Sequence, residues 1–129
     1  MKHKWLGLLG AVAGLVFILS IRPAFAHHGT AAYDTSKQIT VTGTVTEFDF
    51  VNPHTILEFT AKGEGGNTVK WQGELTSPNR LARAGWTRST LKPGSEVTAT
   101  GFPSKGGGNT IWIQKIVADG KELPLGMGD

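Results

Sequence analysis

The stretch from Ile39 to Phe59 most constrains the fold, because its apolar residues change phase within one expected strand. They lie first at odd positions and then at even ones: Ile39, Val41 and Val45, followed by Phe48 and Phe50. Side chains of a strand alternate between two faces, so one unbroken strand cannot bury both sets on the same side. One extra residue near Thr46-Glu47 would restore the phase and bend the strand. A long, bent first strand predicts a small closed barrel in which this strand belongs to both halves.

Residues 1–26 have the three-part pattern of a secretory signal peptide of the Sec type. A basic start precedes an uncharged apolar run from Trp5 to Ile21, and Ala24-Phe25-Ala26 then supplies small residues for cleavage. An uncleaved anchor is the competing interpretation, but the run is at the short limit for a spanning helix and is interrupted by glycines. We predict cleavage after Ala26, a periplasmic or secreted protein, and no stable membrane anchor after cleavage.

The charge of the chain depends on this cleavage. The formal net charge of +3 equals the contribution of Lys2, Lys4 and Arg22, all in the predicted signal peptide. Residues 27–129 therefore carry no net charge before histidine is counted. Nucleic-acid binding needs a basic surface that neutralises phosphates, so we expect no nucleic-acid partner. The chain has no cysteine, so packing rather than disulfides must hold the fold.

Residues 27–129 are expected to form a single domain, beginning with an extended arm at 27–37. Alternation and turn residues predict strands at 39–50, 55–61, 68–75, 96–102 and 110–118, and a short edge strand at 121–125. A short helix is expected within 76–86, because Ser77 can cap it, Pro78 suits its first position and Gly85 can end it. This order predicts an all-β, OB-like five-stranded barrel with one short helix between strands three and four. A plain β-sandwich with an inserted helix is the alternative.

The last long strand carries apolar residues on both faces. Simple alternation places Ile111, Ile113 and Val117 on one face and Trp112, Ile116 and Ala118 on the other. We therefore expect this strand to be covered on both sides for part of its length.

The histidines are the main candidates for chemistry. Cleavage after Ala26 would give His27 a free α-amine beside its imidazole, and these two nitrogens can chelate one metal ion. A third nitrogen would complete a set that Cu(II) accepts, so His27, His28 and His54 are candidate copper ligands. His54 lies in the turn Asn52-Pro53-His54, where proline restricts the backbone. The simpler interpretation is a disordered tail and an ordinary turn.

Other polar and aromatic residues have a structural interpretation beside the functional one. Glu47, Asp49 and Glu58 could orient a histidine or could form the solvent face of their strands. Arg80, Arg83 and Arg88 could bind an anion or form a solvated face. Trp71, Trp86 and Trp112 could line a groove or belong to the core. No phosphate loop, nucleophile elbow or other catalytic constellation is present, so we expect no enzyme.

Several of these residues together resemble a family of small secreted bacterial proteins. They are Ala26-His27-His28, Tyr33-Asp34, Gly43-x-Val45, Phe48, Asn52-Pro53-His54, Trp71, and the segment from Ser77-Pro78 to Gly85-Trp86. The chain is similar over nearly all of residues 27–129 to domain-of-unknown-function family 6152. This resemblance implies the secreted compartment and the domain limits, and it implies no activity.

Two functional hypotheses follow, from different classes. The first is a periplasmic binding module that stores, delivers or senses copper. The second is a module that binds a periplasmic protein or a small ligand on the barrel face, with the histidines incidental. An enzyme using an open copper position ranks third, because no substrate cleft can be recognised in the sequence.

Overall fold

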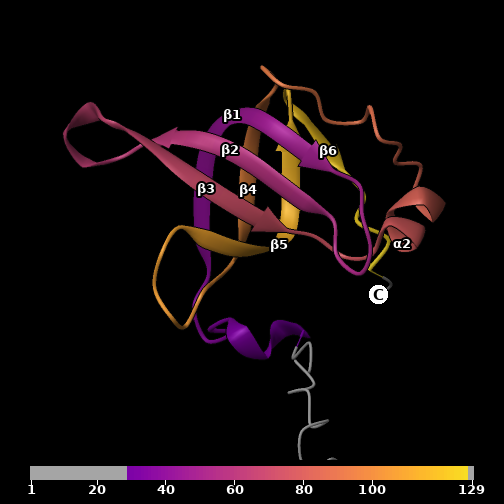
Figure 1. Ribbon diagram of the computed structural model, residues 1–129, viewed down its shortest axis with the longest axis horizontal. Coiled ribbons are helices and arrows are strands. Elements are labelled where there is room, and N and C mark those ends of the chain that lie inside the picture. Colours follow the sequence, from indigo (N-terminus) through magenta and orange to yellow (C-terminus); the bar gives the residue numbers. More distant parts are fainter. Residues whose placement is uncertain (1–28, 128–129) are drawn as a thin grey trace, which may run out of the picture.

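The computed structural model describes residues 29–127, which form one sheet that closes on itself (Figure 1). In chain order the elements are η2 (Gly29–Ala32), β1 (Ile39–Asp49), β2 (Ile56–Lys62), η3 (Glu64–Gly66), β3 (Thr68–Glu74), α2 (Pro78–Arg83), β4 (Glu96–Pro103), β5 (Thr110–Ala118) and β6 (Lys121–Leu123). No helix within residues 29–127 is long and apolar enough to cross a membrane.

The strand order is β3-β2-β1-β4-β5-β6, and an additional β3–β5 pairing closes the barrel. All neighbours are antiparallel except β3 and β5, which pair in parallel over Gln72–Glu74 and Thr110–Trp112. Five strands thus form a closed barrel, with β6 outside it as an extra strand on β5. The predicted OB-like barrel with a short helix between its third and fourth strands is confirmed.

β1 is the strand shared by both halves of the barrel. Its residues 39–44 pair with β4, and its residues 43–49 pair with β2. Val45 lies opposite Phe59 and Glu47 lies opposite Glu58, so Thr46 has no partner on β2. Thr46 is the extra residue predicted from the change of phase, and it lets Val45 and Phe48 both face the core.

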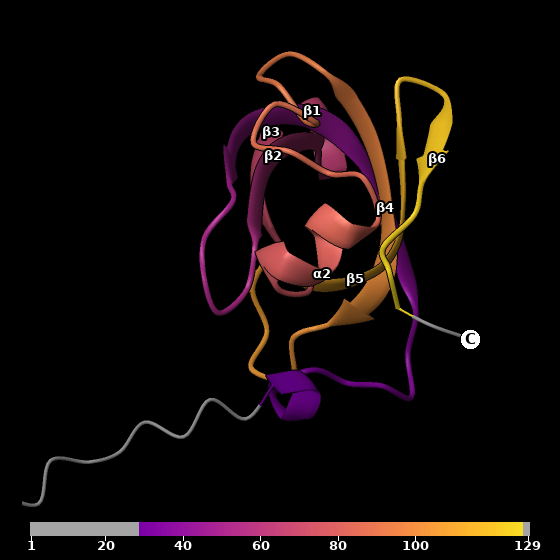
Figure 2. The same ribbon diagram turned by 90° about the vertical axis from the view of Figure 1, so that its right-hand side faces the viewer.

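α2 lies in one mouth of the barrel, as the view along the barrel in Figure 2 shows. The Ser77 hydroxyl accepts a hydrogen bond from the Arg80 N–H at 3.4 Å, and Pro78 begins the helix. Gly85 follows with a φ of +96°, the left-handed conformation that glycine adopts most readily. Leu81 is 0% exposed, so this helix closes one end of the apolar core.

β5 departs from simple alternation at Gln114. Thr100 lies opposite Lys115 and Gly101 lies opposite Ile113, so Gln114 is an extra residue on β5. The bulge reverses the phase of the strand, and Ile116 rather than Val117 joins Ile111 and Ile113 in the core. The assignment of Val117 to the same face as Ile111 and Ile113 was therefore wrong.

The arm before β1 is tied to the loop between β4 and β5. Tyr33 forms an isolated bridge with Ser104, the Asp34 N–H donates to Pro103 O, and the Lys105 N–H donates to Ala32 O. Residues 29–32 form the 3₁₀ turn η2 and do not continue the extended conformation expected for the arm. The turn η2 and the two backbone hydrogen bonds to the β4–β5 loop therefore fix Tyr33 against the barrel.

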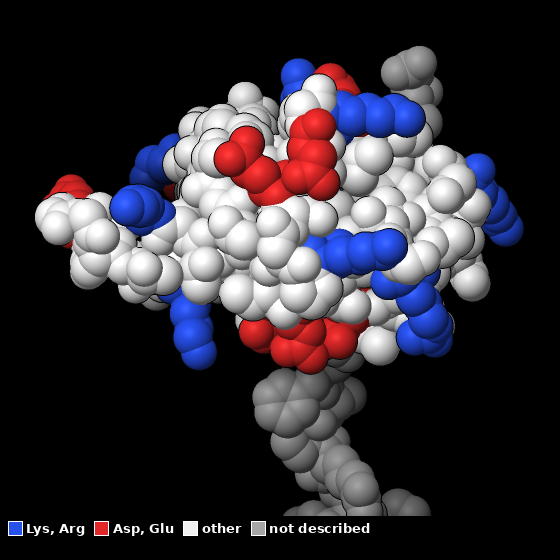
Figure 3. Space-filling view, turned by 90° about the horizontal axis from the view of Figure 1, so that it is seen from above, with Lys and Arg blue, Asp and Glu red and all other residues white. Residues whose placement is uncertain are grey.

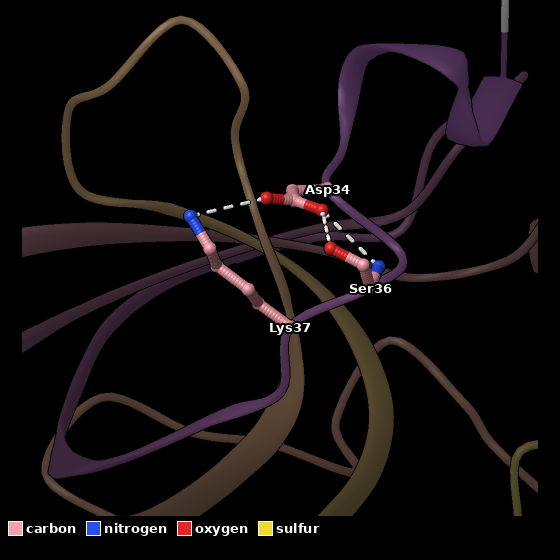
Figure 4. A network of polar contacts seen from close by, with 3 residues as sticks. All are labelled: Asp34, Ser36 and Lys37. Carbon is pink, nitrogen blue, oxygen red and sulfur yellow. Dashed lines mark hydrogen bonds and ion pairs between the residues drawn. The ribbon is translucent and has the colours of Figure 1, made fainter.

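Asp34 stabilises the bend that leads from the arm into β1 (Figure 4). Its carboxylate accepts hydrogen bonds from the Ser36 hydroxyl at 2.5 Å and the Ser36 N–H at 3.1 Å, and pairs with Lys37 Nζ at 3.3 Å. These hydrogen bonds, first of all that from the Ser36 hydroxyl, lower the pKa of Asp34.

Charged side chains of both signs lie on the face shown in Figure 3. Lys and Arg are spread over this face, and Asp and Glu form small separate groups, one near the middle and others at its edges. Neither sign covers this face.

Gly101 provides a test of the β4–β5 contact. An added Cβ would lie 1.9 Å from Trp112 O, so Gly101→Ala must push the two strands apart. We expect this substitution to lower the free energy of unfolding by about 1–3 kcal/mol, measured by urea denaturation. In Gly106→Ala the nearest atom is Ser104 Oγ at 3.8 Å, so this control should change stability by less than about 0.5 kcal/mol. Equal stabilities for the two variants would contradict the close contact.

Candidate functional site

One carboxylate joins three segments that are distant in the sequence. The Tyr33 hydroxyl, from the arm, donates a hydrogen bond to Glu74 Oε2 at 2.5 Å. The His54 ring, from the turn between β1 and β2, bonds through Nδ1 to Glu74 Oε1. Glu74 is the last residue of β3. Both of its oxygens are therefore engaged, one by the arm and one by the turn.

The backbone places His54 beside the end of β3. The Thr55 N–H donates to Thr76 O at 3.2 Å, and the Leu75 N–H donates to Thr55 O at 2.8 Å. These bonds tie the residue after His54 to the residues after Glu74. The preceding Asn52–Pro53 peptide bond is cis.

Trp112 packs against the rings of both residues that bind Glu74. It is the register partner of Glu74 where β5 pairs with β3. Its ring centroid lies 5.2 Å from that of His54, in an edge-on arrangement at 76°, and 5.9 Å from that of Tyr33. Tyr33 is only 4% exposed, whereas the His54 side chain is 26% exposed. The site is thus closed at the tyrosine and open to solvent at the histidine.

Burial raises the pKa of the Tyr33 phenol above its ordinary value. The hydrogen bond to Glu74 and the charge of that carboxylate act in the same direction. All three causes favour the neutral phenol, which is the form that donates to Glu74.

The hydrogen bond to Glu74 determines which nitrogen of His54 is available. A carboxylate accepts hydrogen bonds, so Nδ1 carries a proton and donates it. In the neutral ring this leaves the lone pair on Nε2. A histidine oriented by a carboxylate in this way is the usual arrangement for a metal ligand, and it also suits a proton acceptor.

The structure contains one of the three histidines predicted as metal ligands. His54 lies in the site, and His27 and His28 lie outside the described residues. Among residues 29–127, no three His, Cys, Asp or Glu side chains gather closely enough to hold a metal ion.

The carboxylate that holds His54 was not among the predicted partners. The candidates were Glu47, Asp49 and Glu58, and in the described part of the chain none of them forms a hydrogen bond or ion pair with His54. Simple alternation with Trp71, Gly73 and Leu75 would place the Glu74 side chain on the solvent face of β3. Its position beside the Asn-Pro-His turn follows from the β2–β3 pairing, which the sequence does not determine residue by residue.

The remaining candidates lie elsewhere. Arg80, Arg83 and Arg88 are exposed. The Trp86 indole N–H donates to Pro124 O at 2.7 Å, and its ring belongs to the core. Trp71 is partly exposed and stacks on buried Phe59. Tyr33 links the arm to β3 through its hydrogen bond to Glu74.

Tyr33 can be followed alone, because it is the single tyrosine of the chain. A raised folded-state pKa stabilises the protein below the unfolded pKa, and this contribution is lost as pH rises through the folded value. In an absorbance titration at alkaline pH, we expect little phenolate at about pH 10, where free tyrosine is half ionised. Glu74→Gln should lower the midpoint, because it removes the carboxylate charge. An ordinary midpoint in the folded wild-type protein would contradict burial of the phenol beside a carboxylate.

Comparisons with known proteins identify a family and no activity. No curated protein matches the chain. One solved structure similar to it is a ZRD-deleted mutant of TiaS in complex with agmatine. The identity is 23% and the TM-score is 0.42, over 71% of this chain and 25% of that one. The chain thus spans a quarter of that protein, and a likeness at this TM-score supports no argument about function. Residues 16–112 match the family described as "Family of unknown function (DUF6152)", and the chain belongs to this family.

Proposed function

We propose that this protein is a non-enzymatic copper-binding module of the periplasm or cell exterior. Its ligands would be the α-amine and ring of His27, with His28 beside them, and Nε2 of His54. One observation supports this proposal above the others. Tyr33 of the arm and His54 of the turn bond to the same carboxylate, Glu74. The arm that follows the two N-terminal histidines is therefore anchored beside the third histidine.

Covalent geometry allows the three histidines to meet. The chain from Tyr33 back to His27 would span at most about 20 Å if fully extended, and it spans less with the turn η2 at Gly29–Ala32. The Tyr33 and His54 side chains are separated only by the Glu74 carboxylate. A tether this short supports a site shared by His27, His28 and His54.

The donor set favours copper among the first-row divalent metals. Amine and imidazole nitrogens suit Cu(II), and affinity for nitrogen donors rises along the series to Cu(II) and falls at Zn(II). The chain offers no thiolate, since it has no cysteine. Glu74 would contribute without touching the metal, by fixing the His54 ring and making Nε2 a stronger donor.

The first experiment is a Cu(II) titration followed by electron paramagnetic resonance, on protein processed to begin at His27. We expect stoichiometric binding with a nitrogen-rich spectrum. A matched sample with one extra residue before His27 should lose tight binding, because its α-amine no longer adjoins the His27 ring. Equal, weak binding in the two samples would overturn the proposal.

Two substitutions test the role of the turn. His54→Ala should weaken Cu(II) affinity at least tenfold, which is the scale expected for the loss of a ligand or of the residue that orients it. Glu74→Gln should also weaken Cu(II) affinity, because it removes the carboxylate that orients His54. Glu58→Gln is the matched control, since it removes an exposed carboxylate that does not contact His54. Unchanged affinity in His54→Ala would exclude His54 as a ligand.

A further inference from the structure

The β2–β3 hairpin extends past its neighbours at the end of the barrel away from α2 (Figure 1). The last β1–β2 pair is Gly43 with Ala61, although β2 continues to Lys62. β5 pairs with β3 only from Gln72 onward. Strand pairing between Lys62 and Trp71 is thus confined to the hairpin itself. The start of β1 pairs with β4 alone, so β1 and the hairpin separate at this end.

A hollow of about 540 Å³ is lined by residues of the hairpin and of the start of β1. We call it the hairpin cleft. The hairpin contributes Ala61, Val69 and Trp71, β1 contributes Thr40–Thr42, and the β4–β5 loop contributes Asn109. Small-molecule sites have volumes of about 300–1,000 Å³. The hairpin cleft therefore has room for a small ligand.

Trp71 provides an aromatic surface in the hairpin cleft. Its ring stacks on the buried Phe59 ring, with centroids 6.4 Å apart and planes inclined by 20°. Phe59 therefore supports one side of the indole, and the ring is partly exposed. The face of an aromatic ring is electronegative, so it attracts C–H groups that carry partial positive charge. Val41 and Val69 extend this apolar surface.

Polar side chains of both charges and of neutral type surround the aromatic surface. Lys62, Glu64 and Asn109 line the hairpin cleft and are exposed. Within residues 29–127 neither Lys62 nor Glu64 lies in an ion pair. The ammonium and the amide N–H₂ can donate hydrogen bonds, and the carboxylate and the amide oxygen can accept them. One positive and one negative charge cancel, so the lining favours a neutral ligand that both donates and accepts.

We infer that the hairpin cleft binds a neutral sugar, with one pyranose ring packed on Trp71. A pyranose ring carries C–H groups on its faces and hydroxyl groups around its edge. The C–H groups match the indole and the two valines. The hydroxyl groups match Lys62, Glu64 and Asn109, because each hydroxyl is both a donor and an acceptor. A single ligand class thus accounts for both the apolar and the polar lining.

Two other ligand classes that stack on tryptophan fit the lining less well. Single-stranded nucleic acid needs a positively charged groove, and here Glu64 offsets Lys62. Proline-rich peptides dock in grooves lined by aromatic side chains, whereas Trp71 is the one aromatic residue among the described residues that line the cleft. The hairpin cleft shares no residue with the His54 site, so this inference does not depend on the copper proposal.

The test is a titration with neutral disaccharides, followed by nuclear magnetic resonance. The probes are cellobiose, chitobiose, maltose and lactose. We expect at least one of them to shift the Trp71 indole and Asn109 amide signals saturably at millimolar concentration. The indole signals of Trp86 and Trp112, which are buried outside the cleft, should not move. Sorbitol is the matched control, because it has hydroxyl groups but no ring, and it should cause no saturable shift.

Three outcomes of this titration would overturn the inference. The first is the absence of a saturable shift with all four disaccharides. The second is an equal response to sorbitol, which would show that no ring is recognised. The third is tighter binding of a capped decaproline peptide at the same signals, which would assign the cleft to a proline-rich partner.

Four variants test which side chains bind the sugar. Trp71→Leu removes the aromatic ring and should weaken binding about tenfold, whereas Trp71→Phe should restore most of the affinity. Asn109→Ala should weaken binding roughly two- to tenfold, on the scale of one hydrogen bond. Asn79→Ala, at an exposed position on α2, is the control and should bind like the wild type.

Thermal unfolding shows whether each of these variants is folded. Asn109 is exposed in a loop, so Asn109→Ala provides a test even if Trp71→Leu does not fold. Undiminished binding by Asn109→Ala, or by folded Trp71→Leu, would overturn the inference.

Discussion

The barrel depends on the pairing of β1 with two strands. Its first half pairs with β4 and its second half with β2, and the unpaired Thr46 lies where the strand changes phase. Without that extra residue, Val45 and Phe48 would face opposite sides of the sheet and one half of the strand would lose its core contacts. β2 and β3 then lie over β4 and β5, and the interior between them is filled by Leu57, Phe59, Val97 and Ile113. α2 can close one mouth only because this shared strand brings the two halves together.

Glu74 also joins separate parts of the chain, as β1 does, but through one side chain. A carboxylate at a strand end would ordinarily point into water. Here it accepts one bond from Tyr33 and one from His54, and Trp112 packs against both rings. The arm, the β1–β2 turn and the start of β5 thereby meet at one point. The arrangement orients His54, which is more exposed than Tyr33, the other residue bound to Glu74.

Much of the architecture could be predicted from the sequence, because it depends on local periodicity. The odd-to-even change of apolar positions predicted the bulge at Thr46, and Ser77, Pro78 and Gly85 predicted the helix. The Gln114 bulge could not be predicted, because Val117 and Ile116 are both apolar and either phase gives an acceptable core. The Glu74 interactions depend on which turn lies beside which strand end, and alternation alone describes Glu74 as solvated. His54 could be recognised by residue type, but its partner could not.

The parallel seam between β3 and β5 has a consequence for how the barrel opens. Only Gln72–Glu74 and Thr110–Trp112 close the ring at this point, whereas the antiparallel β1–β2 and β4–β5 ladders are longer. Local unfolding starts where few hydrogen bonds must break together, so we expect β3 and β5 to separate before the other strand pairs of the barrel. The Tyr33–Glu74–His54 cluster lies at one end of this seam. The contacts of Glu74 with the arm and the turn therefore stabilise the end of the β3–β5 pairing. Backbone amides in this pairing would exchange with solvent sooner than those of β1.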